Sequence, residues 1–122
     1  MLNRPIILVA EDEILIQEVM RAFIEDAGMV PVCASSAEEA NALLDQNPGI
    51  DAAFLDIDLG PKGTGFQVAR HARETHPHLP IIYTSGAFQP RFGDERVEDA
   101  DFVPKPYSPE AVAGRLRAAV KG

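Results

Sequence analysis

The 122-residue sequence has one cysteine, no tryptophan, and only 11 basic residues against 19 acidic ones. A single cysteine, Cys33, excludes an intrachain disulfide, so we expect it to be a small packing residue in a reducing environment. The formal net charge of −8 argues against a nucleic-acid partner, because a phosphate backbone is bound through clustered Lys and Arg. No apolar run is long enough to cross a bilayer and no signal-peptide pattern is present, so we predict a cytoplasmic protein without a membrane partner.

The length predicts a single domain over residues 1–122. Short apolar runs, each bounded by turn-forming residues, alternate with stretches of helical periodicity. The expected strands are Ile6–Ala10, Val30–Ala34, Ala52–Ile57, Pro80–Thr84 and Asp101–Pro104. This alternation predicts an α/β fold with a doubly wound, five-stranded parallel sheet, and right-handed crossovers place helices on both of its faces.

The expected helices have recognisable ends. Apolar residues recur at helical spacing from Leu15 to Ile24, and Gly28 is well placed to end that helix. Further helices are expected to about Gln46 after a capping box at Ser35 or Ser36, over Phe66–Thr75, and from Pro109 with Ser108 as N-cap.

The weakest helical pattern lies between Gly86 and Ala100. Pro90 and Gly93 interrupt this segment, and its many acidic residues leave little apolar surface. We therefore expect the fourth helix to be short or irregular, confined to about Asp94–Asp99.

Polar side chains follow four of the predicted strands where each strand ends. They are Glu11 and Asp12 after the first strand, Asp56 at the third, Thr84 at the fourth and Lys105 after the fifth. Open parallel sheets bind ligands outside the carboxyl ends of their strands, so these groups should form one site. Three acids, a hydroxyl and an amine suit a divalent cation and a phosphoryl group.

Spacing also selects among the aspartates of the third strand. Asp51 precedes the apolar run and should lie at the opposite end of the strand, whereas Asp58 lies in the following loop. Asp56 is therefore the expected nucleophile, since a carboxylate can form an acyl phosphate. Lys105 would supply a fixed ammonium and Thr84 a hydroxyl for a phosphoryl oxygen. A simple structural pairing of Lys105 with Asp56 is the alternative.

The motifs in Leu8–Glu13, Asp51–Asp56, Ile82–Gly86 and Phe102–Tyr107 resemble, in order and spacing, the receiver domain of bacterial two-component response regulators. The resemblance runs nearly end to end. It implies a flavodoxin-like strand order 2-1-3-4-5.

The resemblance also implies roles for individual residues. Asp12 and Asp56 would bind Mg²⁺ directly, with the backbone carbonyl of Asp58 as a third ligand and Glu11 acting through water. Thr84 and Lys105 would bind the phosphoryl group. Phe102 would be the aromatic ring whose position is coupled to the movement of Thr84.

The function that follows is a phosphoacceptor module, not an enzyme, which takes a phosphoryl group from a phosphohistidine onto Asp56 and then switches its interaction face. The donor would be a histidine kinase or a histidine phosphotransfer protein, because His71, His76 and His78 are expected on the surface, away from the acids. The domain would be either a stand-alone receiver or part of a larger regulator.

Two alternatives remain. Asp56-Ile57-Asp58 also resembles the nucleophile and acid pair of Mg²⁺-dependent phosphohydrolases of the haloacid dehalogenase type, although Gly60 departs from that motif. A pseudo-receiver that binds partners without phosphorylation is the other, motivated by the irregular region from Gly86 to Ala100.

Overall fold

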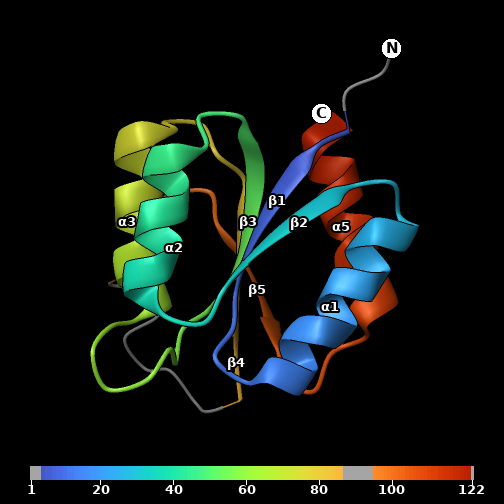
Figure 1. Ribbon diagram of the computed structural model, residues 1–122, viewed down its shortest axis with the longest axis horizontal. Coiled ribbons are helices and arrows are strands. Elements are labelled where there is room, and N and C mark those ends of the chain that lie inside the picture. The colour runs from blue at the N-terminus through green and yellow to red at the C-terminus, as the bar shows by residue number, and fades with distance from the viewer. Residues whose placement is uncertain (1–3, 87–94, 122) are drawn as a thin grey trace.

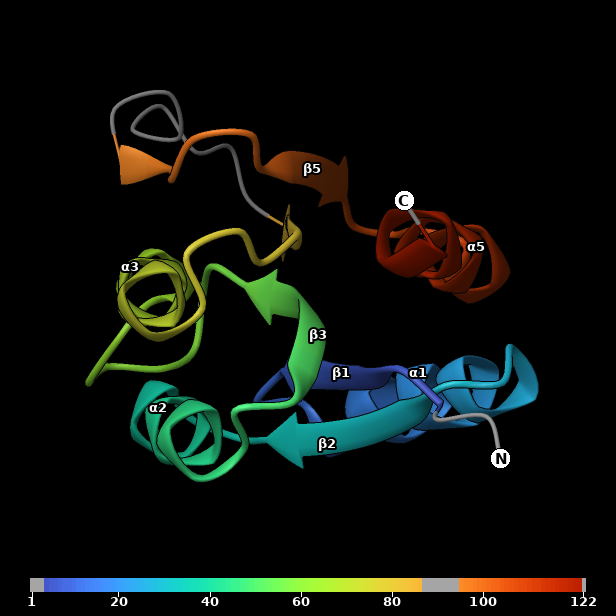
Figure 2. The ribbon, with the colours of Figure 1, turned by 90° about the horizontal axis from the view of Figure 1, so that it is seen from above.

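The computed structural model describes residues 4–86 and 95–121. Its strands are β1 (Ile6–Ala10), β2 (Val30–Ala34), β3 (Ile50–Asp56), β4 (Ile81–Ser85) and β5 (Asp101–Pro104). All neighbouring pairs are parallel, in the order β2-β1-β3-β4-β5. Helices α1 (Ile14–Asp26) and α5 (Pro109–Lys121) cover one face of the sheet, and α2 (Ala37–Gln46) and α3 (Gly65–Thr75) cover the other (Figures 1 and 2). The predicted doubly wound fold and its strand order are confirmed.

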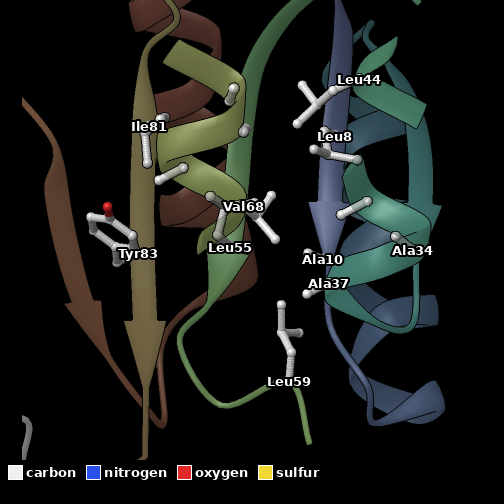
Figure 3. Packing of buried hydrophobic residues seen from close by; sticks show 14 of the residues in the cluster. Leu8, Ala10, Ala34, Ala37, Leu44, Leu55, Leu59, Val68, Ile81 and Tyr83 are labelled. Carbon is white, nitrogen blue, oxygen red and sulfur yellow. The ribbon is translucent and has the colours of Figure 1, made fainter. Parts of the chain in front are cut away.

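The sheet separates two apolar cores, because successive side chains of a strand point to opposite faces. On the side of α2 and α3, the core includes Leu8, Leu55 and Tyr83 (Figure 3). On the side of α1 and α5, it includes Val9 and Phe54. Burial on both faces explains why the strands are nearly continuous apolar runs.

Side-chain caps begin α2 and α3. The Ser36 hydroxyl accepts a hydrogen bond from the Glu39 amide at 3.1 Å, while the Glu39 carboxylate accepts from the Ser35 amide, so the expected capping box is shared between two serines. A complete box that was not predicted joins Thr64 and Gln67 and begins α3 at Gly65, one residue before the expected start.

Strand β3 begins two residues earlier than predicted and ends at Asp56 instead of Ile57. Asp51 lies at its amino-terminal end, where its carboxylate accepts a hydrogen bond from the Ile6 amide at 2.9 Å. Asp51 and Asp56 are thus at opposite ends of the strand, as expected from the sequence.

The irregular segment Gly86–Ala100, in which we expected a short fourth helix, includes residues 87–94, which lie outside the described residues. Of the expected span Asp94–Asp99, Glu95 is helical, whereas none of residues 96–99 is, so the helix does not extend to Asp99. Two observations explain this. The Val97 amide donates to the Tyr83 hydroxyl at 3.1 Å, and Asp99 has a left-handed backbone with φ of 60°.

In the two described stretches, no helix combines the length and the apolar character needed to traverse a membrane.

Candidate functional site

The predicted site residues gather at the carboxyl ends of the strands. Asp56 ends β3 and is in register with Thr84 of β4, so the acceptor and the hydroxyl are neighbours across the sheet. Glu11 directly follows β1, and Lys105 directly follows β5. The strand order places β1 and β4 on either side of β3, which brings side chains from four sequence segments to one edge.

Lys105 connects the acids. Its Nζ lies 2.7 Å from Asp56 Oδ2 and 3.0 Å from Glu11 Oε1, and both acidic residues are almost completely buried. Burial lowers the pKa of the Lys105 ammonium, but its hydrogen bonds to Asp56 and Glu11 outweigh this effect and hold the pKa above its ordinary value. Lys105 is therefore a fixed positive charge beside the predicted acceptor.

At Glu11, in contrast to Lys105, the effect of burial on the pKa outweighs that of the hydrogen bonds. Burial, together with the negative charge of Asp56, raises the pKa of the Glu11 carboxyl from 4.5 to about 7, despite hydrogen bonds from Glu13 and Lys105 that lower it. Because Lys105 lies closer to Asp56 than to Glu11, its charge chiefly compensates Asp56. One lysine does not neutralise this group of acids.

The same acids fit a metal ion. Glu11, Asp12 and Asp56 each offer a carboxylate oxygen, and these oxygens all lie within 4.8 Å of one another. Asp12 is exposed whereas Glu11 and Asp56 are buried, so the cluster opens to solvent on one side. An all-oxygen donor set at a solvent-accessible edge suits a hard divalent cation that retains several waters.

The loop after β3 is held against the acceptor. The Asp58 amide donates to Asp56 Oδ1 at 2.9 Å, and the Asp58 carboxylate accepts from the Ser85 hydroxyl at 2.8 Å. At Gly65 a Cβ atom would overlap the carbonyl oxygen of Asp56, so this position requires glycine for the close approach of the chain. Ser85, which was not singled out in the sequence, joins β4 to this loop.

The hydroxyl of Thr84 differs from the acids in its hydrogen bonding. It is buried, and within residues 4–86 and 95–121 it has no hydrogen-bond partner. A buried hydroxyl without a partner is unfavourable, so this group is available to bond a ligand oxygen. Phe102 is half-buried on β5 and packs against the core on the side of α2 and α3.

Two further residues near the acids were not assigned a site role. Gln17 of α1 is 7% exposed and donates hydrogen bonds beneath Glu11. Its only sequence signal is a polar side chain on the inward-facing stripe of a helix. The Tyr107 ring packs edge-on against Phe54 with centroids 5.3 Å apart, and burial raises the pKa of its hydroxyl to about 12.

The histidines lie away from the acids, as predicted, but two of them have partners. His71 Nε2 is 2.8 Å from the carboxylate of Asp45, which links α3 to α2. His76 Nε2 is 3.2 Å from the backbone oxygen of Asn47. These contacts join secondary-structure elements, so the two side chains are not simply solvated.

Next to the acidic site, α1 exposes an apolar surface. Ile14, Leu15, Val19 and Phe23 are 57%, 82%, 45% and 37% exposed. Leu15, Ile16 and Val19 also line a groove of about 550 Å³, whose other wall includes Lys105 and Tyr107. Of the apolar residues of α1, only Met20 and Ile24 are buried. The predicted apolar stripe of this helix therefore includes more residues than the core buries.

Comparison with known proteins identifies the family and agrees with the fold. Residues 7–117 match the family described as response regulator receiver domain. The chain is 31% identical over 119 residues to the phosphate regulon transcriptional regulatory protein PhoB of Escherichia coli and 28% identical over 116 residues to the transcriptional regulatory protein CpxR of the same species. These matches cover 94% of this chain but 51% and 49% of the relatives, so the chain spans about half of their length.

Solved structures are similar along the whole chain. A response regulator receiver protein from Sinorhizobium medicae superposes with a TM-score of 0.92 at 29% identity, covering 100% of this chain and 98% of that one. The chemotaxis protein CheY4 of Vibrio cholerae, at 23% identity and a TM-score of 0.84, shares the fold over 96% of this chain and 99% of its own. The chain belongs to the receiver domain family of response regulators, which are generally signalling modules.

Proposed function

We propose that this domain is the phosphoacceptor of a two-component or phosphorelay system and that Asp56 receives the phosphoryl group with Mg²⁺ as cofactor. The observation that carries the proposal is the contact of Asp56 with Lys105 at 2.7 Å, within a group of three carboxylates, Asp56 included, that can hold a cation. Phosphoryl transfer needs positioning and charge neutralisation more than acid-base chemistry, and these groups supply both.

The residues present fit the cation. Asp12 and Asp56 would be the direct ligands, the backbone carbonyl of Asp58 a third, and Glu11 would act through water. The amide of Asp58 already donates to Asp56, which fixes that part of the loop beside the acceptor. When bound, Mg²⁺ neutralises charge on the acids and on the phosphoryl oxygens.

Asp56 is the nucleophile in the transfer. An O–P bond forms to its carboxylate as the N–P bond of the phosphohistidine breaks, and the imidazole leaves neutral when its other ring nitrogen carries a proton. Lys105 donates a charge-assisted hydrogen bond to one phosphoryl oxygen. Thr84, whose hydroxyl is buried without a partner among the described residues, donates to another. Its movement is coupled to the ring of Phe102, which alters the interaction face.

The donor is a histidine kinase or a histidine phosphotransfer protein. The exposed apolar residues of α1 border the groove that reaches Lys105, which supports docking of a donor helix at this side of the acids. The net charge of −8 supports a protein, and not a nucleic acid, as the partner of the domain itself. We further propose a cytoplasmic receiver that forms one domain over residues 1–122, either alone or within a larger regulator.

The test is the intact mass of the protein after incubation with Mg²⁺ and acetyl phosphate. The wild type should gain one phosphoryl group, and chelation of the metal should prevent the gain. Asp56→Asn should not be labelled. Asp51→Asn is the matched control, since it makes the same change at the far end of β3, and it should be labelled like the wild type.

Two further measurements, of phosphate release and of Mg²⁺ binding, separate the alternatives. A phosphohydrolase of the haloacid dehalogenase type would release inorganic phosphate repeatedly from small phosphomonoesters. A receiver is labelled once, and its acyl phosphate then hydrolyses slowly. An unlabelled wild-type protein that still binds Mg²⁺ would contradict our proposal and favour the pseudo-receiver.

A further inference from the structure

A buried glutamine lies beneath the acidic turn. Gln17 belongs to the inward stripe of α1, together with Met20 and Ile24, and is 7% exposed. Its Nε2 atom lies 3.0 Å from the backbone oxygen of Glu11, 3.2 Å from that of Ala34 and 3.3 Å from the hydroxyl of Ser35. A polar group in an apolar stripe is unfavourable unless it is hydrogen-bonded, and Gln17 finds its acceptors in two different turns.

These bonds hold Glu11 by its main chain. The Glu11 amide donates to the Ala34 oxygen at 3.0 Å, the same oxygen that accepts from Gln17. The Glu11 carbonyl accepts from Gln17 itself, and the carboxylate accepts from the Glu13 amide and pairs with Lys105. Gln17 is thus the side chain that fixes the peptide group between Glu11 and Asp12.

The turn needs this support for two reasons. Helix α1 has Glu13 at its N-cap, which makes no side-chain capping bond, so the start of the helix is not fixed in the usual way. The carboxylates of Glu11, Asp12 and Asp56 also lie close enough to repel one another when no cation is bound. Without a support, the turn would be free to move the acids apart.

We propose that Gln17 is a positioning residue for the metal site: by fixing the backbone of Glu11 against the end of β2, it holds the acid pair in place before the cation arrives. This inference rests on the proposed function only in that Mg²⁺ is the cation of the site. Gln17 does not touch the phosphoryl group or the metal. It acts through Glu11 and Asp12.

The decisive variant is Gln17→Met, which preserves the length and volume of the side chain and removes both amide hydrogens. Ile24→Val is the matched control, because it removes a methyl group from the same buried stripe without touching the turn. Magnesium affinity, measured by titration calorimetry with MgCl₂ alone, should weaken about tenfold in Gln17→Met. The control should stay within about twofold of the wild type.

A second measurement reads the turn without metal. Amide hydrogen exchange of Glu11 and Glu13 should be faster in Gln17→Met than in Ile24→Val. The two variants are compared under conditions in which their free energies of unfolding are equal. If Gln17→Met does not fold, Gln17→Asn serves instead, because its shorter amide cannot reach the Glu11 and Ala34 oxygens together. It too should weaken Mg²⁺ binding about tenfold.

Equal Mg²⁺ affinity and equal exchange in the glutamine variants and the control would overturn the inference and leave the proposed function intact. A wild-type protein that neither binds Mg²⁺ nor accepts a phosphoryl group would overturn both. The two failures are therefore distinguishable in the wild type before any variant is compared.

Discussion

The two halves of the acidic site are built differently. On the side of β1 and β3, Glu11 and Asp56 have both of their carboxylate oxygens bonded, to backbone amides and to Lys105. On the side of β4, the Thr84 hydroxyl is buried and has no partner in the described parts of the chain. The acid half is organised by hydrogen bonds from the protein itself, whereas the hydroxyl half has a donor still to be paired. Under the proposed function, the cation would therefore meet a prepared site, and the phosphoryl group would supply the partner of Thr84.

The largest effect that would sharpen this comparison is expected for Lys105→Met. Removing the fixed ammonium should slow labelling of Asp56 by acetyl phosphate about 100-fold, because charge on the transferred group is no longer offset. Magnesium affinity should not fall, since a positive charge beside the acids has been removed. Rates come from intact-mass time courses, with Lys62→Met, in the loop after β3, as control. A loss of Mg²⁺ binding would show instead that Lys105 organises the acid half.

The pH dependence of stability tests the acid half next. The pKa of Glu11 is about 7 in the folded protein against an ordinary 4.5, so the folded state holds this proton more tightly than the unfolded state. The stabilisation that comes from this proton is complete below about pH 4.5. As the pH rises through 7 it is lost, which lowers the free energy of unfolding by up to about 3 kcal/mol.

Urea unfolding of the metal-free protein across this pH range measures the effect. Glu11→Gln cannot titrate at this position, so its stability should fall less steeply than that of the wild type. Identical slopes would contradict the assignment. Saturating Mg²⁺ should also reduce the fall, because the cation favours the ionised carboxylates.

Thr84→Val probes the hydroxyl half. The substitution keeps the shape of the side chain and removes a buried hydroxyl without a described partner, so the free energy of unfolding should rise by about 1 kcal/mol. Labelling of Asp56 should nevertheless become slower. Thr64→Val makes the same change at the N-cap of α3 and should lower the stability by about 1 kcal/mol. A lower stability in both variants would mean that the Thr84 hydroxyl already has a partner.

The smallest effect on the domain itself is expected for Leu15→Lys, on the exposed surface of α1. Leu15 is 82% exposed, so stability should change by less than about 0.5 kcal/mol, and labelling by acetyl phosphate should not change. Transfer from the histidine kinase that labels the wild type should become slower. Ala42→Lys, on the exposed side of α2, is the control. Equal transfer in both variants would place the donor elsewhere.

The order of apolar runs and breakers was enough to predict the sheet and the strand-end acids. Asp56 could be separated from Asp51 because a strand has two ends and the apolar run lies between them. The capping box at Thr64 was missed because the surrounding glycines and proline indicated only a turn. Gln17 was missed because its acceptors, on Glu11 and Ala34, come together only after the strands are paired. Ser85 was missed for the same reason, since its partner is Asp58.

The sequence by itself determined which residues could carry the chemistry, since local periodicity and strand ends are written in the chain. The structure, in contrast, showed that α1 has more apolar surface than its contact with the core buries. Only the tertiary structure decided that Lys105 bridges Glu11 and Asp56 and that the Thr84 hydroxyl is left without a described partner. Distances and pKa shifts of this kind depend on burial and on neighbours from distant segments, and these arise only when the parallel strands are brought together.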